Sequence, residues 1–166
     1  GTPYVGQVWY NQNLGDLRIR KTNLNNAWST GNPLNTARQG VGQAGTQTAA
    51  LAFGGYDGTA VTAVTEQYNG TNWTEVADLN TARDSSAGFG ATNAAAIYAG
   101  GSGTPDGAIT ESWNGTSWTE VGNLNTARNT LAGNGTSTSG LVYGGYITTN
   151  QTLTESWNGT SWTEVA

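Results

Sequence analysis

Three arginines recur at a constant interval and are the first candidates for a chemical role. Arg38, Arg83 and Arg128 each end a Leu-Asn-Thr-Ala-Arg string, and successive strings start 45 residues apart. Arranged around a common axis, their guanidinium groups could bind carboxylates or sugar hydroxyls, because a guanidinium presents several donors in one plane. The alternative is that each arginine pairs with a repeated glutamate and ties the connection between units. A residue repeated identically in every unit favours this structural interpretation.

Two sets of repeated glutamates are available as partners, and they raise the question of acid–base catalysis. The sets are Glu66, Glu111 and Glu155, and Glu75, Glu120 and Glu164. Glycoside hydrolysis needs two carboxyl groups at a defined separation in one asymmetric site. Here the carboxylates recur in all three units and look interchangeable, and the chain has no Gly-x-Ser-x-Gly string and no phosphate-binding loop. We therefore predict a non-enzymatic protein with no catalytic residue.

The composition restricts cofactors. The chain contains no Cys and no His, which excludes a Cys/His metal site, a thiol nucleophile and an imidazole base. A Ca²⁺ site built from carboxylates alone stays open in principle, although no Asp-x-Asp-x-Asp-Gly run occurs. We predict no metal site and no cofactor.

Charge and hydropathy restrict the partners. Only six residues are basic and the formal net charge is −5, so there is no basic stripe for nucleic acid and no polybasic patch for a membrane surface. No apolar run approaches the roughly 20 residues of a membrane-spanning helix. The chain begins with Gly1 and has no Met, so we expect a processed product or an excerpt of something longer.

Internal repetition is the main signal in the sequence. After each arginine come a small-residue stretch, an apolar run ending in a Gly pair, an aromatic residue with Asn-Gly, and Trp-Thr-Glu-Val. The repeats span 34–78, 79–123 and 124–166. Residues 1–33 fit the same register without its first segment: 17–20 (Leu-Arg-Ile-Arg) align with Thr-Glu-Ser-Trp, and 27–30 with Ser-Trp-Thr-Glu.

Each repeat is predicted to contain four strands. Asn-Gly between aromatic residues is a strong hairpin signal, because both turn residues tolerate positive φ. The apolar run before the Gly pair suits a strand that is buried on both faces, and the small-residue stretch suits an innermost strand. No segment shows a sustained helical period. We expect an all-β chain with at most a turn of helix.

The order of these landmarks resembles the kelch repeat, in which a Gly pair is followed by a Tyr and then a Trp. The matching residues are Gly54-Gly55/Tyr68/Trp73, Gly100-Gly101/Trp113/Trp118 and Gly144-Gly145/Trp157/Trp162, with Trp in place of the middle Tyr in two repeats. The resemblance implies a single β-propeller domain over 1–166, built from blades of four antiparallel strands. Three blades are complete and one is truncated at its N-terminus.

Ring closure is left open by the repeat count. Single-chain propellers have roughly four to eight blades. This chain could close as a strained four-bladed ring, two chains could associate into a larger ring, or the blades could belong to a longer parent chain. Exposed strand edges would favour pairing with another chain.

The tryptophans and the variable loops complete the candidate sites. The fixed hairpin positions of Trp73, Trp118 and Trp162 favour core packing over stacking on sugar rings. The loop after each Gly pair differs between repeats and holds the remaining candidates for ligand binding: Tyr56 and Asp57, Asp106, and Tyr146. The segment after each arginine varies as well. Neutral drift in solvated turns is the alternative explanation for both.

A second resemblance concerns the setting of the protein. The segments 6–11 and 15–19, and the Asn-Gly-Thr-Ser-Trp repeats joined by Leu-Asn-Thr-Ala-Arg, are similar to modules of bacteriophage tail and virion structural proteins. This resemblance implies a non-catalytic structural or adhesion module at a virion surface, or another extracellular location. Its expected partners are other virion or tail proteins, copies of itself, or a host surface glycan or protein. The alternative is a secreted bacterial lectin-like protein on the same fold.

Overall fold

The chain is all-β wherever its structure is described. The computed structural model describes residues 8–11, 16–19, 31–103 and 107–165, and none of these residues is helical. It follows that the described part contains no helix that could cross a membrane. The sequence-based prediction of an all-β fold is confirmed.

The chain divides into two compact units, which we describe separately. The first unit, Gly1–Gly31, contains an antiparallel pair of strands, β1 (Val8–Asn11) and β2 (Asp16–Ile19), in which Val8 lies opposite Ile19. The strand predicted at 27–30 lies outside the described residues. That residues 1–33 form a fourth, truncated blade of one domain stays a prediction.

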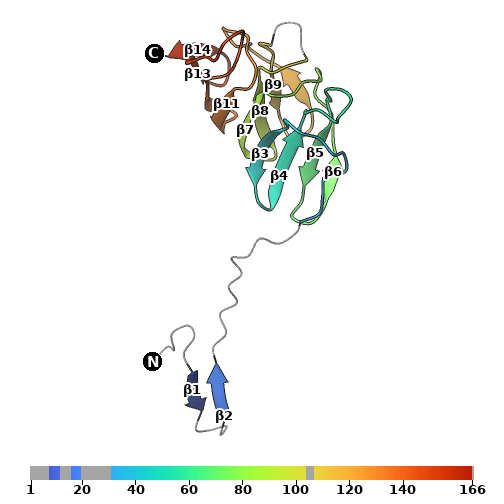
Figure 1. Cartoon of the computed structure of the whole chain (residues 1–166), viewed down its shortest axis with the longest axis vertical. Helices are drawn as coiled ribbons and strands as arrows, with labels where there is room; N and C mark the ends of the chain where they lie inside the picture. The colour runs from blue at the N-terminus through green and yellow to red at the C-terminus, as the bar shows by residue number, and fades with distance from the viewer. Residues whose placement is uncertain (1–7, 12–15, 20–30, 104–106, 166) are drawn as a thin grey trace. The chain divides into compact units, whose positions relative to one another are not determined.

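The second unit, Asn32–Ala166, contains three four-stranded antiparallel sheets, each formed by consecutive strands (Figure 1). Sheet 1 contains β3 (Gly42–Thr46), β4 (Ala49–Phe53), β5 (Thr65–Tyr68) and β6 (Trp73–Glu75). Sheet 2 contains β7 (Ala87–Thr92), β8 (Ala95–Ala99), β9 (Thr110–Trp113) and β10 (Trp118–Glu120). Sheet 3 contains β11 (Ala132–Thr136), β12 (Ser139–Tyr143), β13 (Thr154–Trp157) and β14 (Trp162–Val165). The predicted four-strand, blade-like repeat is confirmed in all three copies.

The Asn-Gly hairpins form as their residue types require. In sheet 1 the side-chain Oδ1 of Asn69 accepts the backbone N–H groups of Thr71 and Asn72, at 3.0 and 2.9 Å, and Gly70 takes a φ of 92°. Tyr68 and Trp73 then lie opposite each other, with ring centroids 5.0 Å apart. Turn chemistry and a cross-strand aromatic pair therefore define the register of the outer hairpin.

The first strands of the three sheets lie side by side, in the order β3, β7, β11. Glycine permits this close approach. A Cβ added to Gly88 on β7 would come within 2.6 Å of the Gln43 backbone nitrogen on β3, and one on Gly133 would come within 2.9 Å of the Ala87 Cβ. Sheets 1 and 3 lie at the two ends of this row, and the three sheets do not close a ring.

Two hydrophobic cores join neighbouring sheets. Between sheets 1 and 2, Phe53 makes edge contacts with Tyr98 and Trp118, with centroids 5.0 and 4.8 Å apart. Between sheets 2 and 3, Phe89 packs edge-on against Trp162 at 6.4 Å. Sheet-to-sheet packing, rather than the interior of any one sheet, therefore supplies the apolar burial.

Gly88→Ala should destabilise the second unit. The added methyl group would collide with the backbone of β3, and overpacking of this kind costs about 1–3 kcal/mol of unfolding free energy. Chemical denaturation followed by tryptophan fluorescence measures the change. Gly31→Ala is the control, because a Cβ there would meet nothing within 4 Å. Equal midpoints for the two variants would contradict glycine-dependent packing.

Candidate functional site

Each repeated arginine forms a buried ion pair with a glutamate of its own sheet. The Nη1–Oε1 distances are 2.8 Å for Arg38–Glu66, 2.5 Å for Arg83–Glu111 and 2.5 Å for Arg128–Glu155. The three arginine side chains have no exposed surface. The glutamates lie on the third strand of each sheet. The other set, Glu75, Glu120 and Glu164, is exposed on the fourth strands.

The second carboxylate oxygen is bound by the asparagine of the Leu-Asn-Thr-Ala-Arg string. In sheet 2, Glu111 Oε2 accepts the backbone N–H of Asn80 at 2.7 Å and its side-chain amide at 2.8 Å. The same amide donates to the Trp118 carbonyl at 3.0 Å. Equivalent bonds occur in sheets 1 and 3. We call this arrangement the clamp. It holds the connection, which is the segment before the first strand of each sheet, against the third and fourth strands of that sheet.

The arginine backbone fastens the same connection to the preceding sheet. The N–H of Gly55 donates to the Arg83 carbonyl and that of Gly101 to the Arg128 carbonyl, both at 3.0 Å. The structure thus supports the structural interpretation of the arginines. A ring of guanidiniums open to a ligand does not form, because every guanidinium is buried against carboxylate and carbonyl oxygens.

The carboxyl group of Glu155 has a shifted pKa. Burial acts to raise the pKa, but the Arg128 guanidinium and the two donors of Asn125 favour the charged form more strongly, so the pKa lies below its ordinary value. The Glu155 carboxylate is therefore ionised at neutral pH and stabilises the folded state in that form.

The two variable segments of each repeat meet on one face of the second unit. Isolated antiparallel bridges join residues of the connection to residues of the loop after the Gly pair: Gln39 to Tyr56, Asp84 to Ser102, and Asn129 to Tyr146. We call these six residues and their loops the loop face. Because successive turns of an antiparallel meander alternate between its ends, the Asn-Gly hairpins lie at the opposite end of each sheet. Sequence reasoning named both segments without showing that they are paired.

The loop of sheet 1 is held by an aspartate turn. Asp57 Oδ1 accepts from the Thr59 hydroxyl and backbone N–H, both at 2.7 Å, and from the Ala60 N–H at 2.9 Å. These hydrogen bonds, that of the Thr59 side chain first, lower the pKa of Asp57 to about 2. The Tyr56 hydroxyl donates to the Gly58 carbonyl at 3.1 Å. Both candidate residues of this loop therefore help to shape it.

The remaining loop candidates are Tyr146 and Asp106. Tyr146 is 44% exposed and is followed by Ile147, which is exposed to the same degree. Asp106 lies outside the described residues. At the junctions of the loop face, Ser85 and Thr130 adopt a φ of 55°, which is rare for residues other than glycine and is often found at functional sites. Of the predicted site residues, the structure brings Tyr56, Asp57 and Tyr146 to this face.

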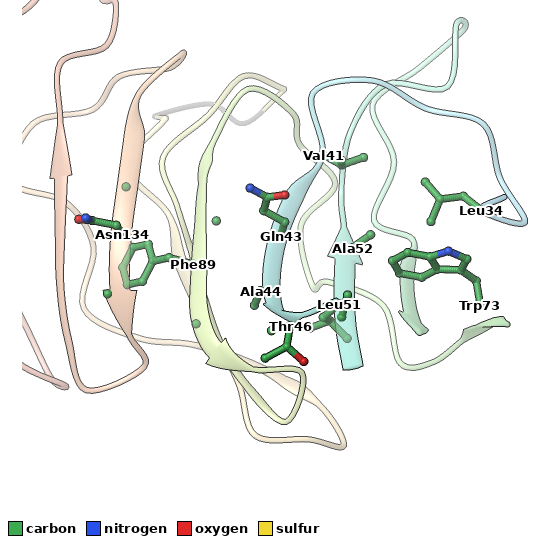
Figure 2. A pocket seen from close by; sticks show the side chains of 16 residues that line it. Leu34, Val41, Gln43, Ala44, Thr46, Leu51, Ala52, Trp73, Phe89 and Asn134 are labelled. Atoms are coloured by element: carbon green, nitrogen blue, oxygen red, sulfur yellow. The ribbon is translucent and has the colours of Figure 1, made fainter. Parts of the chain in front are cut away.

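A cavity of about 630 Å³ lies along the first strands and one side of sheet 1 (Figure 2). Gln43, Thr46 and Asn134 are the polar side chains among its lining residues, and none of the lining residues is charged. Trp73 lines the cavity and is only half-buried, whereas Trp118 and Trp162 are buried. Core packing is therefore confirmed for those two, whereas Trp73 is only half-buried, because no other sheet of the second unit covers its side of sheet 1.

The described residues contain no group of three or more His, Cys, Asp or Glu side chains placed to hold a metal ion. Comparison with known proteins adds no assignment. No protein-family model matches the sequence, and no curated protein matches it.

Glu111→Ala should unfold the second unit at much lower denaturant than the parent. Removing one partner of a buried pair leaves the Arg83 charge uncompensated, which costs about 3–5 kcal/mol of unfolding free energy. Glu120→Ala is the matched control on the exposed set and should change the unfolding free energy by less than about 0.5 kcal/mol. Denaturation curves for the two variants measure the difference. A small effect at Glu111 would contradict the importance of the clamp.

Stability should fall as the solution is acidified through the carboxylate range. A glutamate whose folded pKa is depressed contributes stability that is present above its unfolded value of 4.5 and is lost as the pH falls through the folded value. Denaturation series between neutral and acidic pH measure the slope for the parent and for Glu155→Gln. The variant should be less stable at neutral pH and show a shallower decline. An unchanged slope would count against a depressed Glu155 pKa.

Proposed function

We propose that this protein is a non-catalytic structural and adhesion module whose loop face binds a glycan or protein on a host cell surface. One observation carries the proposal. In every repeat the two segments that vary are bridged to each other on one face, while the clamp beneath them is the same in all three sheets. A constant framework carrying variable loops is the usual arrangement of a recognition surface.

The chemistry of the loop face suits a neutral, hydroxyl-rich ligand. Tyrosine at positions 56 and 146 provides an aromatic surface and a hydroxyl group, and Gln39 and Asn129 provide amides that both donate and accept. The formal net charge of −5 disfavours a polyanionic partner. A neutral sugar of a surface glycan is therefore the ligand class that fits best.

The proposed setting is a phage virion or tail, with the sheets acting as blades of a kelch-like propeller. The resemblance of the repeat landmarks to phage structural modules supports the setting, and the three four-stranded sheets support the blade-like part of the proposal. A secreted lectin-like protein would use the same face, so the ligand test serves both settings.

Glycan-array binding with the full chain tests the proposal. We expect a signal for a restricted set of neutral glycans, weakened about tenfold, or about 1.4 kcal/mol, by Tyr146→Ala. Thr116→Ala, at the exposed hairpin of sheet 2 on the opposite end, is the control and should leave binding unchanged. A flat array, together with no binding to intact host cells, would refute adhesion and leave only a scaffold.

A further inference from the structure

The two junctions between neighbouring sheets are built from the same three cross-sheet hydrogen bonds. The second glycine of the Gly pair donates to the carbonyl of the next arginine, as described above. The backbone N–H of Ser85 donates to the Gly40 carbonyl, and that of Thr130 to the Ser85 carbonyl. Each outer tryptophan donates its indole N–H to a threonine hydroxyl of the preceding sheet: Trp118 to Thr65 at 3.0 Å and Trp162 to Thr110 at 3.1 Å.

The same groups lack partners at the two ends of the row of sheets. On the outer side of sheet 1, which we call the leading face, the Arg38 carbonyl, the Gly40 N–H and the Trp73 indole have no hydrogen-bond partner among the described residues. On the outer side of sheet 3, the trailing face, the same holds for the Gly145 N–H, the Thr130 carbonyl and the Thr154 hydroxyl. Each donor left over on one face corresponds to an acceptor left over on the other.

Apolar burial shows the same pattern. Leu51 and Ile97, which face the next sheet, are 1% and 0% exposed, whereas the equivalent Leu141 on the trailing face is 41% exposed. Tyr143 is 43% exposed, although the equivalent Phe53 and Ala99 are fully buried. On the leading face, Leu34 and Trp73 are half-buried. Both line the cavity (Figure 2). Both faces therefore have the composition of an internal junction with one side removed.

We propose that the trailing face of one copy binds the leading face of a second copy, head to tail. Residues 1–33 fit this role less well, because their sequence places Leu17 at the position of the threonine and has no Gly pair between the strand at 8–10 and Leu17. The trailing face of a second copy supplies both Thr154 and Gly145. Two copies bring six sheets together, within the roughly four to eight that close a ring.

Paired cysteines test the orientation directly, because the parent chain has none. At the first internal junction, a Cβ on Gly40 would lie 3.6 Å from the Asp84 Cβ, within the disulfide range of roughly 3.5–4.5 Å. The equivalent pair between copies is Thr130 of one and Gln39 of the next, and both residues are exposed. The double variant Gln39→Cys/Thr130→Cys should form a disulfide between chains on mild oxidation. Ser85→Cys/Asn129→Cys, at the second internal junction, should form one within the chain.

Each outcome of the cross-linking decides for or against the proposal. Chains linked by Gln39→Cys/Thr130→Cys, with neither single-cysteine variant linking, support a head-to-tail interface. A disulfide within one chain would show that the second unit closes on itself, and no disulfide at all would show that the faces do not meet. Efficient linking by a single-cysteine variant would indicate a symmetric contact. Each of the last three results overturns the proposal.

Native mass measurement of the unmodified full chain gives an independent test. A mass of twice the 17.2 kDa of one chain, or a higher multiple, supports association, and the single-chain mass at all concentrations overturns it. Tyr143→Asp should abolish the assembly at concentrations where the parent is fully assembled, while keeping the far-ultraviolet circular dichroism of the parent. Thr116→Asp, on an exposed hairpin of the middle sheet, introduces the same charge and should leave the assembly intact.

Discussion

The buried arginine–glutamate pair is the interaction on which the rest of the second unit depends. Burying a guanidinium and a carboxylate is costly unless nearly every hydrogen-bonding position is used. In sheet 2 the Arg83 side chain donates to Glu111 and to the carbonyls of Thr81, Tyr98 and Gly100. Asn80 occupies the other oxygen of Glu111. Satisfying the two charges therefore brings the connection, the second strand and the third strand into one arrangement.

This arrangement explains why the invariant and variable parts of each repeat lie where they do. In sheet 2 the clamp uses the side chains of Asn80 and Arg83 and the backbone N–H groups of Asn80 and Thr81, all of which donate to Glu111. The residues immediately after the arginine bridge to the loop after the Gly pair of the same repeat and to the next sheet through backbone groups, which place little restriction on their side chains. The residues of the clamp are therefore the same in all three repeats, whereas the sequence of the loop face differs between repeats. The proposed recognition surface could therefore change without disturbing the fold that supports it.

The row of sheets also explains the uneven burial along the chain. A blade-like sheet is apolar on both faces, so its stability depends on neighbours rather than on its own interior. The middle sheet has two neighbours, and its Ile97, Tyr98 and Ala99 are fully buried. Within the second unit the outer sheets have one neighbour each, and the apolar side chains exposed on sheet 3 are the direct result. Whether the row of sheets closes into a ring therefore depends on what contacts its two outer faces, and not on the internal structure of any one sheet.

The repeat boundaries, the strand number and the Asn-Gly hairpins were determined by the sequence alone, because turn residues and apolar spacing act locally. Pairing of each arginine with a repeated glutamate was also predicted, but not which set. Glu66 and Glu75 lie opposite each other on adjacent strands, and only the course of the incoming connection selects the inner one. Tertiary structure alone decided the different exposure of Trp73 and Trp118, and of Leu141 and Leu51. The two residues of each pair occupy the same position in different repeats. Their burial differs because only one of them faces another sheet of the second unit.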